Sequence, residues 1–258
     1  MGKKKKVVFF DIDGTLLNDE NELPRSTKEA IFKLKENGVY VAIATGRSPF
    51  MFEELRKELG IDTFVSANGS YVVVEGKVIS HTPLETEKLM KLELATTKEN
   101  HSMVFIGENG LFANRENDEY IEKSLRDLGM SYPPVLKEEY KRVPIYQALV
   151  FCEAHEEGYL KEHEYFKYIR WHEFALDVLP SEGSKAKGVQ KVLEHLSFAV
   201  EDTYAFGDGF NDIEMLQFVG TGIAMANGRE QTKAVADFVT KRVDEDGVYY
   251  GLKAVGLI

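Results

Sequence analysis

The chain has 258 residues, of which 43% are hydrophobic and 29% charged, and its formal net charge at pH 7 is −11. This size allows one large domain or two modest ones, with enough apolar residues for a packed core. The acidic balance argues against nucleic acid and anionic membranes as general partners. No apolar stretch approaches the roughly 18 residues of a membrane span, and Cys152, the single cysteine, excludes an intramolecular disulfide. We expect a cytoplasmic protein that is a monomer or a weak homo-oligomer.

The first predicted element is a buried strand at Val7–Phe10, four apolar residues that run directly into two aspartates. The carboxyl end of such a strand is where open α/β sheets place their ligands. Asp11 and Asp13 lie there two residues apart, followed by Gly14 and Thr15. Two adjacent carboxylates repel each other unless a cation or a shared proton compensates. An alternative role for this segment is to cap a helix through Asp13 or Thr15. The position of the two aspartates directly after a buried strand instead favours a catalytic site with a divalent metal.

The next elements predict a parallel sheet. Ser26 is a plausible N-cap for a helix over 27–37, and Glu29 would complete a capping box. A second buried strand over 39–44 follows, and strand, helix, strand is the pattern of a parallel βαβ unit. A helix over 49–59, a strand over 63–66 and a hairpin over 71–80 complete this region.

From about residue 83 the pattern changes, and it returns to strand–helix alternation at about residue 184. Between these points, helical segments near 86–99, 118–128 and 155–165 alternate with strands near 103–106, 147–151, 168–170 and 175–178. Beyond them we predict helices over 185–196, 213–218 and 229–236, strands over 203–206, 222–225 and 238–240, and a C-terminal helix. We therefore predict a discontinuous α/β core made of 1–82 and 184–258, with an inserted α+β domain at 83–183.

Phosphoryl transfer is the chemistry that these strand ends suit. It needs an in-line nucleophile, a proton donor and acceptor, and cations on the phosphoryl oxygens. Asp11 can be the nucleophile, and Asp13 can protonate the leaving alkoxide and then deprotonate the attacking water. Asp208, at the end of another apolar run, can supply the second carboxylate for Mg²⁺, which takes one or two carboxylates besides phosphate and water.

Other polar residues also follow predicted strands or begin a predicted helix. Thr45 and the backbone N–H of Gly46 can donate to a phosphate, as can the backbone N–H of Gly14. Asn211 and Asp212 can orient the metal ligands, and Lys185 can neutralise phosphoryl charge and keep Asp11 ionised. Each feature alone has an ordinary explanation: a loop at 45–47, a surface lysine at 185, a calcium-type turn at 207–212. The turn at 207–212 lacks the distal ligand of a twelve-residue calcium loop. The joint occurrence of all three features in one chain favours a phosphoryl-transfer site over these ordinary explanations.

Together these residues resemble the four motifs of the haloacid dehalogenase superfamily: Asp11-x-Asp13, Thr45, Lys185, and Gly207-Asp208-x-x-Asn211-Asp212. The segments 44–47, 67–69, 222–227 and 245–248 are similar to those of its Cof-type subfamily. The resemblance implies a Rossmann-like parallel-sheet core with an inserted C2-type cap. It also implies Mg²⁺ held by Asp11, Asp208 and the backbone carbonyl of Asp13, with Asp212 behind them. The reaction would be hydrolysis of a small phosphomonoester.

Two points stay open in the sequence. Lys187 is an alternative to Lys185, and two residues apart on a helix they point in different directions. The substrate is the second point. Arg47 and Asn68 are candidates to bind it, a cap would close over the leaving group, and three polar residues near the end of the insertion are further candidates: His172, Glu173 and Asp177. We expect a small phosphorylated metabolite, with sugar phosphates ahead of nucleotide, flavin or pyridoxal phosphates. A phosphomutase or phosphotransferase and a non-catalytic sugar-phosphate sensor are the alternatives.

Overall fold

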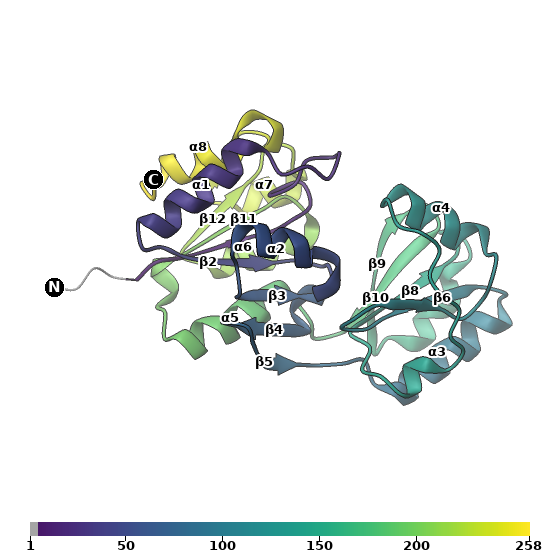
Figure 1. Ribbon diagram of the computed structural model, residues 1–258. Helices are drawn as coiled ribbons and strands as arrows, with labels where there is room; N and C mark the ends of the chain where they lie inside the picture. The colour runs from purple at the N-terminus through teal and green to yellow at the C-terminus, as the bar shows by residue number, and fades with distance from the viewer. Residues whose placement is uncertain (1–4) are drawn as a thin grey trace. The chain divides into compact units, whose positions relative to one another are not determined.

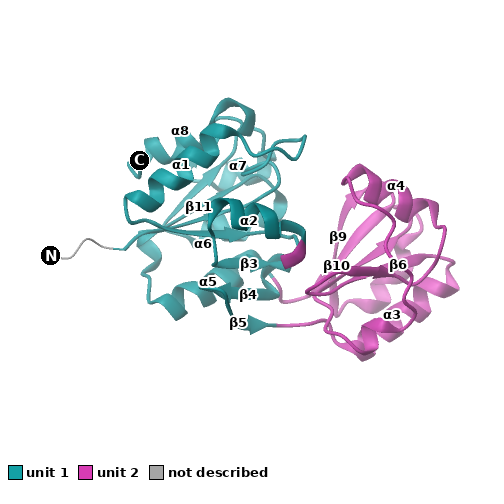
Figure 2. Cartoon of the chain, in the orientation of Figure 1, with its two compact units in different colours: residues 1–47, 51–81, 184–258 teal, residues 48–50, 82–183 magenta. Residues whose placement is uncertain are grey.

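Strand β1 (Val7–Phe10) lies at the centre of an eight-stranded sheet in the computed structural model, which describes residues 5–258 (Figure 1). The chain divides into two units, drawn in different colours in Figure 2. Unit 1 comprises residues up to 47, Met51–His81 and Ser184–Ile258, and unit 2 comprises Ser48–Phe50 and Thr82–Gly183. The chain leaves unit 1 after His81 and re-enters it at Ser184, beside the predicted boundaries 82/83 and 183/184, but Ser48–Phe50, which the prediction placed in the core, belongs to unit 2.

The sheet of unit 1 has the order β13-β12-β11-β1-β2-β3-β4-β5. Its strands from β13 to β3 are parallel, whereas β4 and β5 form an antiparallel hairpin at one edge. Besides β1, the bounds are β2 (Tyr40–Ala44), β3 (Phe64–Ser66), β4 (Tyr71–Val74), β5 (Lys77–His81), β11 (Thr203–Gly207), β12 (Thr221–Ala224) and β13 (Phe238–Val239). Because β1 is covered on both faces, all four of its residues are fully buried. The predicted α/β fold with a central parallel sheet is confirmed.

Helices cover both faces of this sheet (Figure 1). Helices α1 (Arg25–Glu36) and α8 (Gly247–Ala254) pack together on one face, while α5 (Lys185–Leu196) and α6 (Ile213–Phe218) pack on the other. The shorter helices are α2 (Glu53–Leu59) and α7 (Glu230–Val235). Side chains alternate between the faces along a strand, so Val7 and Phe9 share one core cluster with Val189, Val192 and Met215 of α5 and α6.

The predicted start of the first helix is wrong. Helix α1 begins at Arg25, directly after Pro24, and no side chain caps it. Pro24 fixes the backbone (φ −57°) before the first helical residue, so Ser26 lies inside the first turn rather than at the cap. Its hydroxyl is buried and has no hydrogen-bond partner among the described residues. Glu29 pairs with Arg25 (2.7 Å) instead of closing a capping box.

Unit 2 contains an antiparallel five-stranded sheet of order β7-β6-β8-β10-β9. Its strands are β6 (Ser102–Ile106), β7 (Leu111–Ala113), β8 (Gln147–Phe151), β9 (Phe166–His172) and β10 (Ala175–Pro180), and its helices are α3 (Thr86–Lys98) and α4 (Glu119–Asp127). The side chain of Asp118 caps α4. The helix predicted over 155–165 is wrong in type, because Glu157–His163 forms a 3₁₀ helix. Phe105 and Tyr140 stack at 4.5 Å in the core of this unit.

Asp177 is an ionisable residue inside unit 2. It lies on β10 and accepts a hydrogen bond from Nε2 of Gln147 on β8 (2.9 Å). Burial raises the pKa of the Asp177 carboxyl to about 7, although the hydrogen bond from Gln147 opposes this rise. The carboxylate form is therefore disfavoured in the folded protein.

We expect Asp177→Asn to stabilise the protein increasingly as pH rises. The folded-state pKa, about 7, exceeds the unfolded value of about 3.9. Protonation of Asp177 thus contributes stability at low pH that is lost as pH rises through about 7. Asn keeps the acceptor for Gln147 and carries no charge. Urea unfolding should show the variant ahead of the wild type by about 1–3 kcal/mol at pH 8.5, and little changed or behind it at pH 4. Asp19→Asn, in an exposed loop, should give a small difference that is the same at both pH values, and a flat difference for Asp177→Asn would refute the prediction.

Candidate active site

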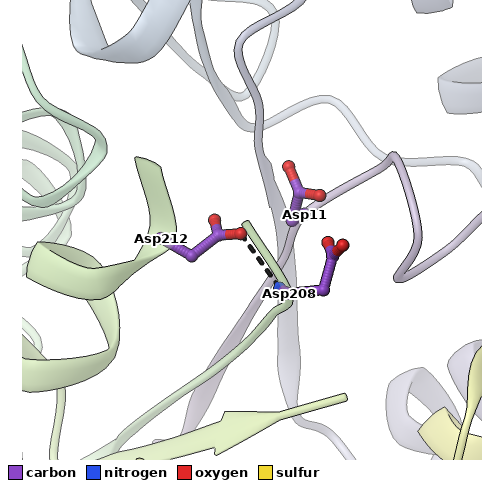
Figure 3. A group of neighbouring side chains, drawn as sticks. All are labelled: Asp11, Asp208 and Asp212. Carbon is purple, nitrogen blue, oxygen red and sulfur yellow. Dashed lines mark hydrogen bonds between the residues drawn. The ribbon is translucent and has the colours of Figure 1, made fainter. Parts of the chain in front are cut away.

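Three aspartates meet at the carboxyl ends of β1 and β11. These strands are parallel neighbours, with Phe10 beside Phe206, so the residues that follow them emerge side by side. Asp11 follows β1, Asp208 follows β11, and Asp212 ends the short 3₁₀ helix η6 (Phe210–Asp212). One carboxylate oxygen from each of the three lies within 4.8 Å of the others (Figure 3). Asp11 and Asp212 are buried, and Asp208 is partly exposed.

Lys185 holds two of these carboxylates. Its Nζ donates to Oδ1 of Asp11 (2.5 Å) and to Oδ1 of Asp212 (2.7 Å). The lysine is the first residue of α5, and its side chain is fully buried. The start of α5 lies against the turn after β3, since a Cβ on Gly69 would be only 2.1 Å from the carbonyl oxygen of Ser184. Of the two candidate lysines, Lys185 lies in the cluster, and Lys187 is exposed on the same helix.

The charge of the cluster is unbalanced. Burial raises the pKa of Asp11 well above its usual value, and the carboxylates of Asp212 and Asp208 raise it further against the opposing charge of Lys185. Burial and Asp212 likewise raise the pKa of Asp208 to about 7. Burial alone would lower the pKa of Lys185, but Asp11 and Asp212 raise it above its usual value, so the ammonium stays charged. The negative charge that remains is what a bound cation would neutralise.

The donor set fits a small divalent cation such as Mg²⁺, which prefers carboxylate, carbonyl and water oxygens. Asp212 is already engaged, because its Oδ2 accepts the backbone N–H groups of Asp208 (3.0 Å) and Gly209 (2.9 Å) while its Oδ1 accepts from Lys185. Asp208 accepts one hydrogen bond, from the hydroxyl of Thr15 (3.3 Å). Asp11 and Asp208 are therefore the carboxylates with oxygens available for a metal, and Asp212 orients the loop behind them.

Asp13 lies apart from this cluster and is engaged by an arginine. Its carboxylate accepts from Nη2 (2.5 Å) and Nε (3.1 Å) of Arg47, a two-point pairing of the kind that guanidinium makes with carboxylate. Arg47 also donates to Oδ1 of Asn21 (3.0 Å). The Asp13 side chain remains 60% exposed, so it is open to solvent and to a substrate.

The remaining predicted phosphate contacts lie around the end of β2. The hydroxyl oxygen of Thr45 accepts the backbone N–H of Arg47 (3.0 Å), which leaves its proton free to be donated elsewhere. Nδ2 of Asn211 donates to Oδ1 of Asn68 (3.0 Å), and a Cβ on Gly46 would be 3.2 Å from Nδ2 of Asn68. Gly46 therefore allows the two asparagines to lie directly over the loop after β2.

Asn68 is part of a left-handed turn. Three successive residues have positive φ: Ala67 (47°), Asn68 (50°) and Gly69 (93°). This conformation is uncommon for alanine and costs free energy, and such strained backbone clusters at functional sites. The turn brings the Asn68 amide next to Asn211.

The candidate residues of unit 2 do not form one cluster. His172 contacts Ser124 (2.9 Å) and Asp127 (3.2 Å), both on or next to α4. Glu173 is exposed in the turn after β9, and Asp177 faces Gln147. His172 and Asp177 thus already have partners within unit 2.

Sequence reasoning missed some contacts of the site. Asn21 was not singled out, and it accepts from Arg47. Thr15 was considered only as a helix cap, yet it donates to Asp208. The one sequence signal for Asn21 is its position in the polar loop after Asp13; its positive φ (60°) is visible only in the structure.

Comparisons with known proteins agree with the geometry. A family model described as haloacid dehalogenase-like hydrolase matches residues 8–252. The chain is 42% identical over 253 residues to "Putative phosphatase YkrA" of Bacillus subtilis (strain 168), covering 98% of each chain. It is 29% identical to the Bacillus subtilis 5-amino-6-(5-phospho-D-ribitylamino)uracil phosphatase YwtE, covering 95% of this chain and 96% of the other.

A solved structure gives the same result. The HAD subclass IIB sugar phosphatase BT4131 superposes with a TM-score of 0.87 and 32% identity, covering 98% of this chain and 100% of the other. Within residues 5–258, none of the helices has the length and apolar content that crossing a membrane requires.

Proposed function

Because this chain belongs to the haloacid dehalogenase-like hydrolases and is a Cof-type phosphatase of that family, we propose that it hydrolyses small phosphomonoesters with Mg²⁺ and through an aspartyl-phosphate. The observation that carries this proposal is the contact of Lys185 with both Asp11 and Asp212, beside Asp208. That arrangement combines a carboxylate nucleophile, a fixed cation and oxygen ligands for a metal.

In the first step Asp11 attacks the phosphorus. A bond forms between its carboxylate oxygen and phosphorus while the bond to the leaving oxygen breaks. Asp13, in its protonated form, gives its proton to the leaving alkoxide. Lys185 stabilises the negative charge on the phosphoryl oxygens and holds the Asp11 side chain in place. Thr45 and the backbone N–H of Gly46, which follow the end of β2, would donate to the same oxygens.

The second step returns the enzyme to its starting state. Asp13, now a carboxylate, takes a proton from water, and the resulting oxygen attacks the aspartyl-phosphate. Phosphate leaves, and Asp11 is regenerated as a carboxylate. Mg²⁺ held by Asp11, Asp208 and the backbone carbonyl of Asp13 would supply charge neutralisation at the phosphoryl group. Asp212 and Asn211 would keep the loop that bears Asp208 in position.

Arg47 has a second role in this proposal. It pairs with Asp13. An anionic substrate competes for the guanidinium, so binding would draw Arg47 towards phosphate or a sugar oxygen and leave the Asp13 carboxyl group free to contact the leaving oxygen. Asn68, joined to Asn211, would contact the same side of the substrate.

Sugar phosphates are the proposed substrate class, and unit 2 the proposed cap that selects among them. The support is the similarity to the sugar phosphatase BT4131 along nearly the whole chain. Similarity to a phosphatase of a phosphoribityl compound points to the same chemistry, a polyol chain ending in phosphate. The proposed setting is the cytoplasm, with the protein acting as a monomer or weak homo-oligomer on free metabolites.

The test is phosphate release from a panel of sugar, nucleotide and vitamin phosphates, measured with Mg²⁺ and with a chelator. We expect turnover of sugar phosphates that falls at least about 100-fold on chelation, because the metal supplies several kcal/mol of charge stabilisation. Restored Mg²⁺ should restore the rate. Chelator-resistant turnover would refute the metal requirement. A wild type that binds sugar phosphates but releases no phosphate would favour a sensor, and release only in the presence of a sugar acceptor would favour a transferase.

A further inference from the structure

Asn227 joins two segments that lie far apart in the sequence. Its Nδ2 donates to the backbone carbonyl of Gly14 (2.8 Å), directly after Asp13. Its Oδ1 accepts the backbone N–H of Val243 (2.9 Å), at the start of the 3₁₀ helix η7 (Val243–Glu245). Both ends of this amide are therefore used, and the turn that carries Asp13 is tied to the C-terminal part of unit 1.

The two residues that follow Asn227 contact the other carboxylate loop. The backbone N–H of Arg229 donates to the carbonyl oxygen of Asp208 (2.9 Å). A Cβ on Gly228 would lie 2.9 Å from both the Cα and the carbonyl oxygen of Asp208, so the two backbones are in direct contact. Thr232 adds a hydrogen bond to the carbonyl oxygen of Gly209 (2.8 Å). The tripeptide 227–229 thus touches both loops that bear the proposed metal ligands.

The fit between these loops is close. Gly14 has a positive φ (74°), and a Cβ there would be 2.5 Å from Oδ2 of Asp208 and 3.2 Å from Nδ2 of Asn227. A small displacement of the Gly14 turn would therefore change the distance between Asp13 and the Asp208 carboxylate. The side-chain amide of Asn227 binds the Gly14 carbonyl, and the backbone of the next two residues contacts Asp208.

We propose that Asn227 is a positioning residue that fixes the spacing of the two loops, and so tunes the affinity of the site for a divalent cation. The inference rests on the proposed metal site of the phosphatase. It gives a physical role to the segment 222–227, which resembles the Cof-type subfamily without belonging to the four catalytic motifs. Partners that orient metal ligands from behind typically affect affinity by about 10–100-fold.

The experiment measures Mn²⁺ binding by the full chain, with Mn²⁺ as a paramagnetic substitute for Mg²⁺, by electron paramagnetic resonance and calorimetry. Asn227→Ala should raise the Kd for Mn²⁺ about tenfold or more. Gly228→Ala is a second variant, which keeps the Asn227 amide but pushes the same tripeptide away from Asp208 and so lengthens the hydrogen bond from Arg229 to the Asp208 carbonyl; it should also raise the Kd. It carries the test if Asn227→Ala does not fold.

Asn37→Ala is the matched control. Nδ2 of Asn37 donates to the carbonyl oxygen of Leu257 (2.9 Å), a bond of the same kind that joins distant segments away from the carboxylates. The control should bind Mn²⁺ within about twofold of the wild type, even if all three variants lose stability in urea unfolding. Equal Kd values for Asn227→Ala and the wild type would overturn the inference, as would an equal rise in Asn37→Ala. If the wild type binds no Mn²⁺, the proposed metal site is wrong as well. If the wild type binds Mn²⁺ and Asn227→Ala binds it equally well, only the inference about Asn227 is wrong.

Discussion

Asp11→Asn should lower kcat by at least about 10⁴-fold, the scale of losses seen when a covalent nucleophile is removed. Asn keeps the shape of the side chain but has no anionic oxygen to attack phosphorus. Burial and neighbouring carboxylates raise the pKa of Asp11, so its ionised form destabilises the metal-free fold at neutral pH. We therefore expect the variant to be as stable as the wild type, or more so, in the presence of a chelator. Phosphate release and thermal unfolding measure the two effects.

The intermediate gives a separate control for this variant. Wild-type protein quenched in acid during turnover of a radiolabelled substrate should retain label on the chain, and Asp11→Asn should retain none. If the variant releases phosphate at a rate near that of the wild type, Asp11 is not the nucleophile. If the variant is inactive only because it is unfolded, the unfolding measurement will show it.

Lys185→Met should remove both activity and stability. Methionine has a similar length but no charge, so Asp11 and Asp212 would remain buried without the ammonium that contacts both. Breaking a buried ion pair in this way typically costs about 3–5 kcal/mol of the free energy of unfolding. Loss of the fixed cation beside the phosphoryl group should also lower kcat by about 10²–10³-fold. Urea unfolding and phosphate release are the measurements.

Lys187→Met is the matched control, since Lys187 is exposed on the same helix two residues later. A surface substitution of this kind should change the free energy of unfolding by about 0.5 kcal/mol or less, and the rate by no more than about twofold. The reverse outcome, with Lys187→Met inactive and Lys185→Met active, would assign the catalytic lysine to position 187.

The sheet could be predicted because its strands are short apolar runs that end in polar residues. Val7–Phe10 is such a run, and a strand that is buried on both faces leaves this signature whatever its neighbours are. The first residues of the helices were harder to predict. Ser26 and Glu29 have the spacing of a capping box, yet Pro24 occupies the cap position and the helix begins at Arg25, two residues before the predicted start. The segment Glu157–His163 has a helical composition but winds as a 3₁₀ helix, a distinction that composition does not carry.

The parts of the site that lie directly at strand ends were visible in the sequence. The structure brings Asp11, Asp208 and Lys185 together, and parallel neighbouring strands explain why. Contacts made through the backbone were not visible. Asn227 bonds to Gly14, 213 residues away, and no local pattern specifies that pair. The left-handed turn at Ala67 and Asn68 was missed for a similar reason, because alanine gives no sign of a positive φ.

The place of β1 between β2 and β11 has a consequence for synthesis on the ribosome. Val7 pairs on one side with Tyr40 and on the other with Thr203. At about 5–20 residues per second, the nascent chain takes roughly 8–33 s to go from one partner to the other. During that time one edge of β1 has no neighbour and is open to aggregation or chaperone binding. All strands of the inserted sheet, from Ser102 to Pro180, are made in the interval. A growing chain therefore carries Asp11, the proposed nucleophile, throughout this interval, but the proposed site stays incomplete until Lys185 and Asp208 have been made.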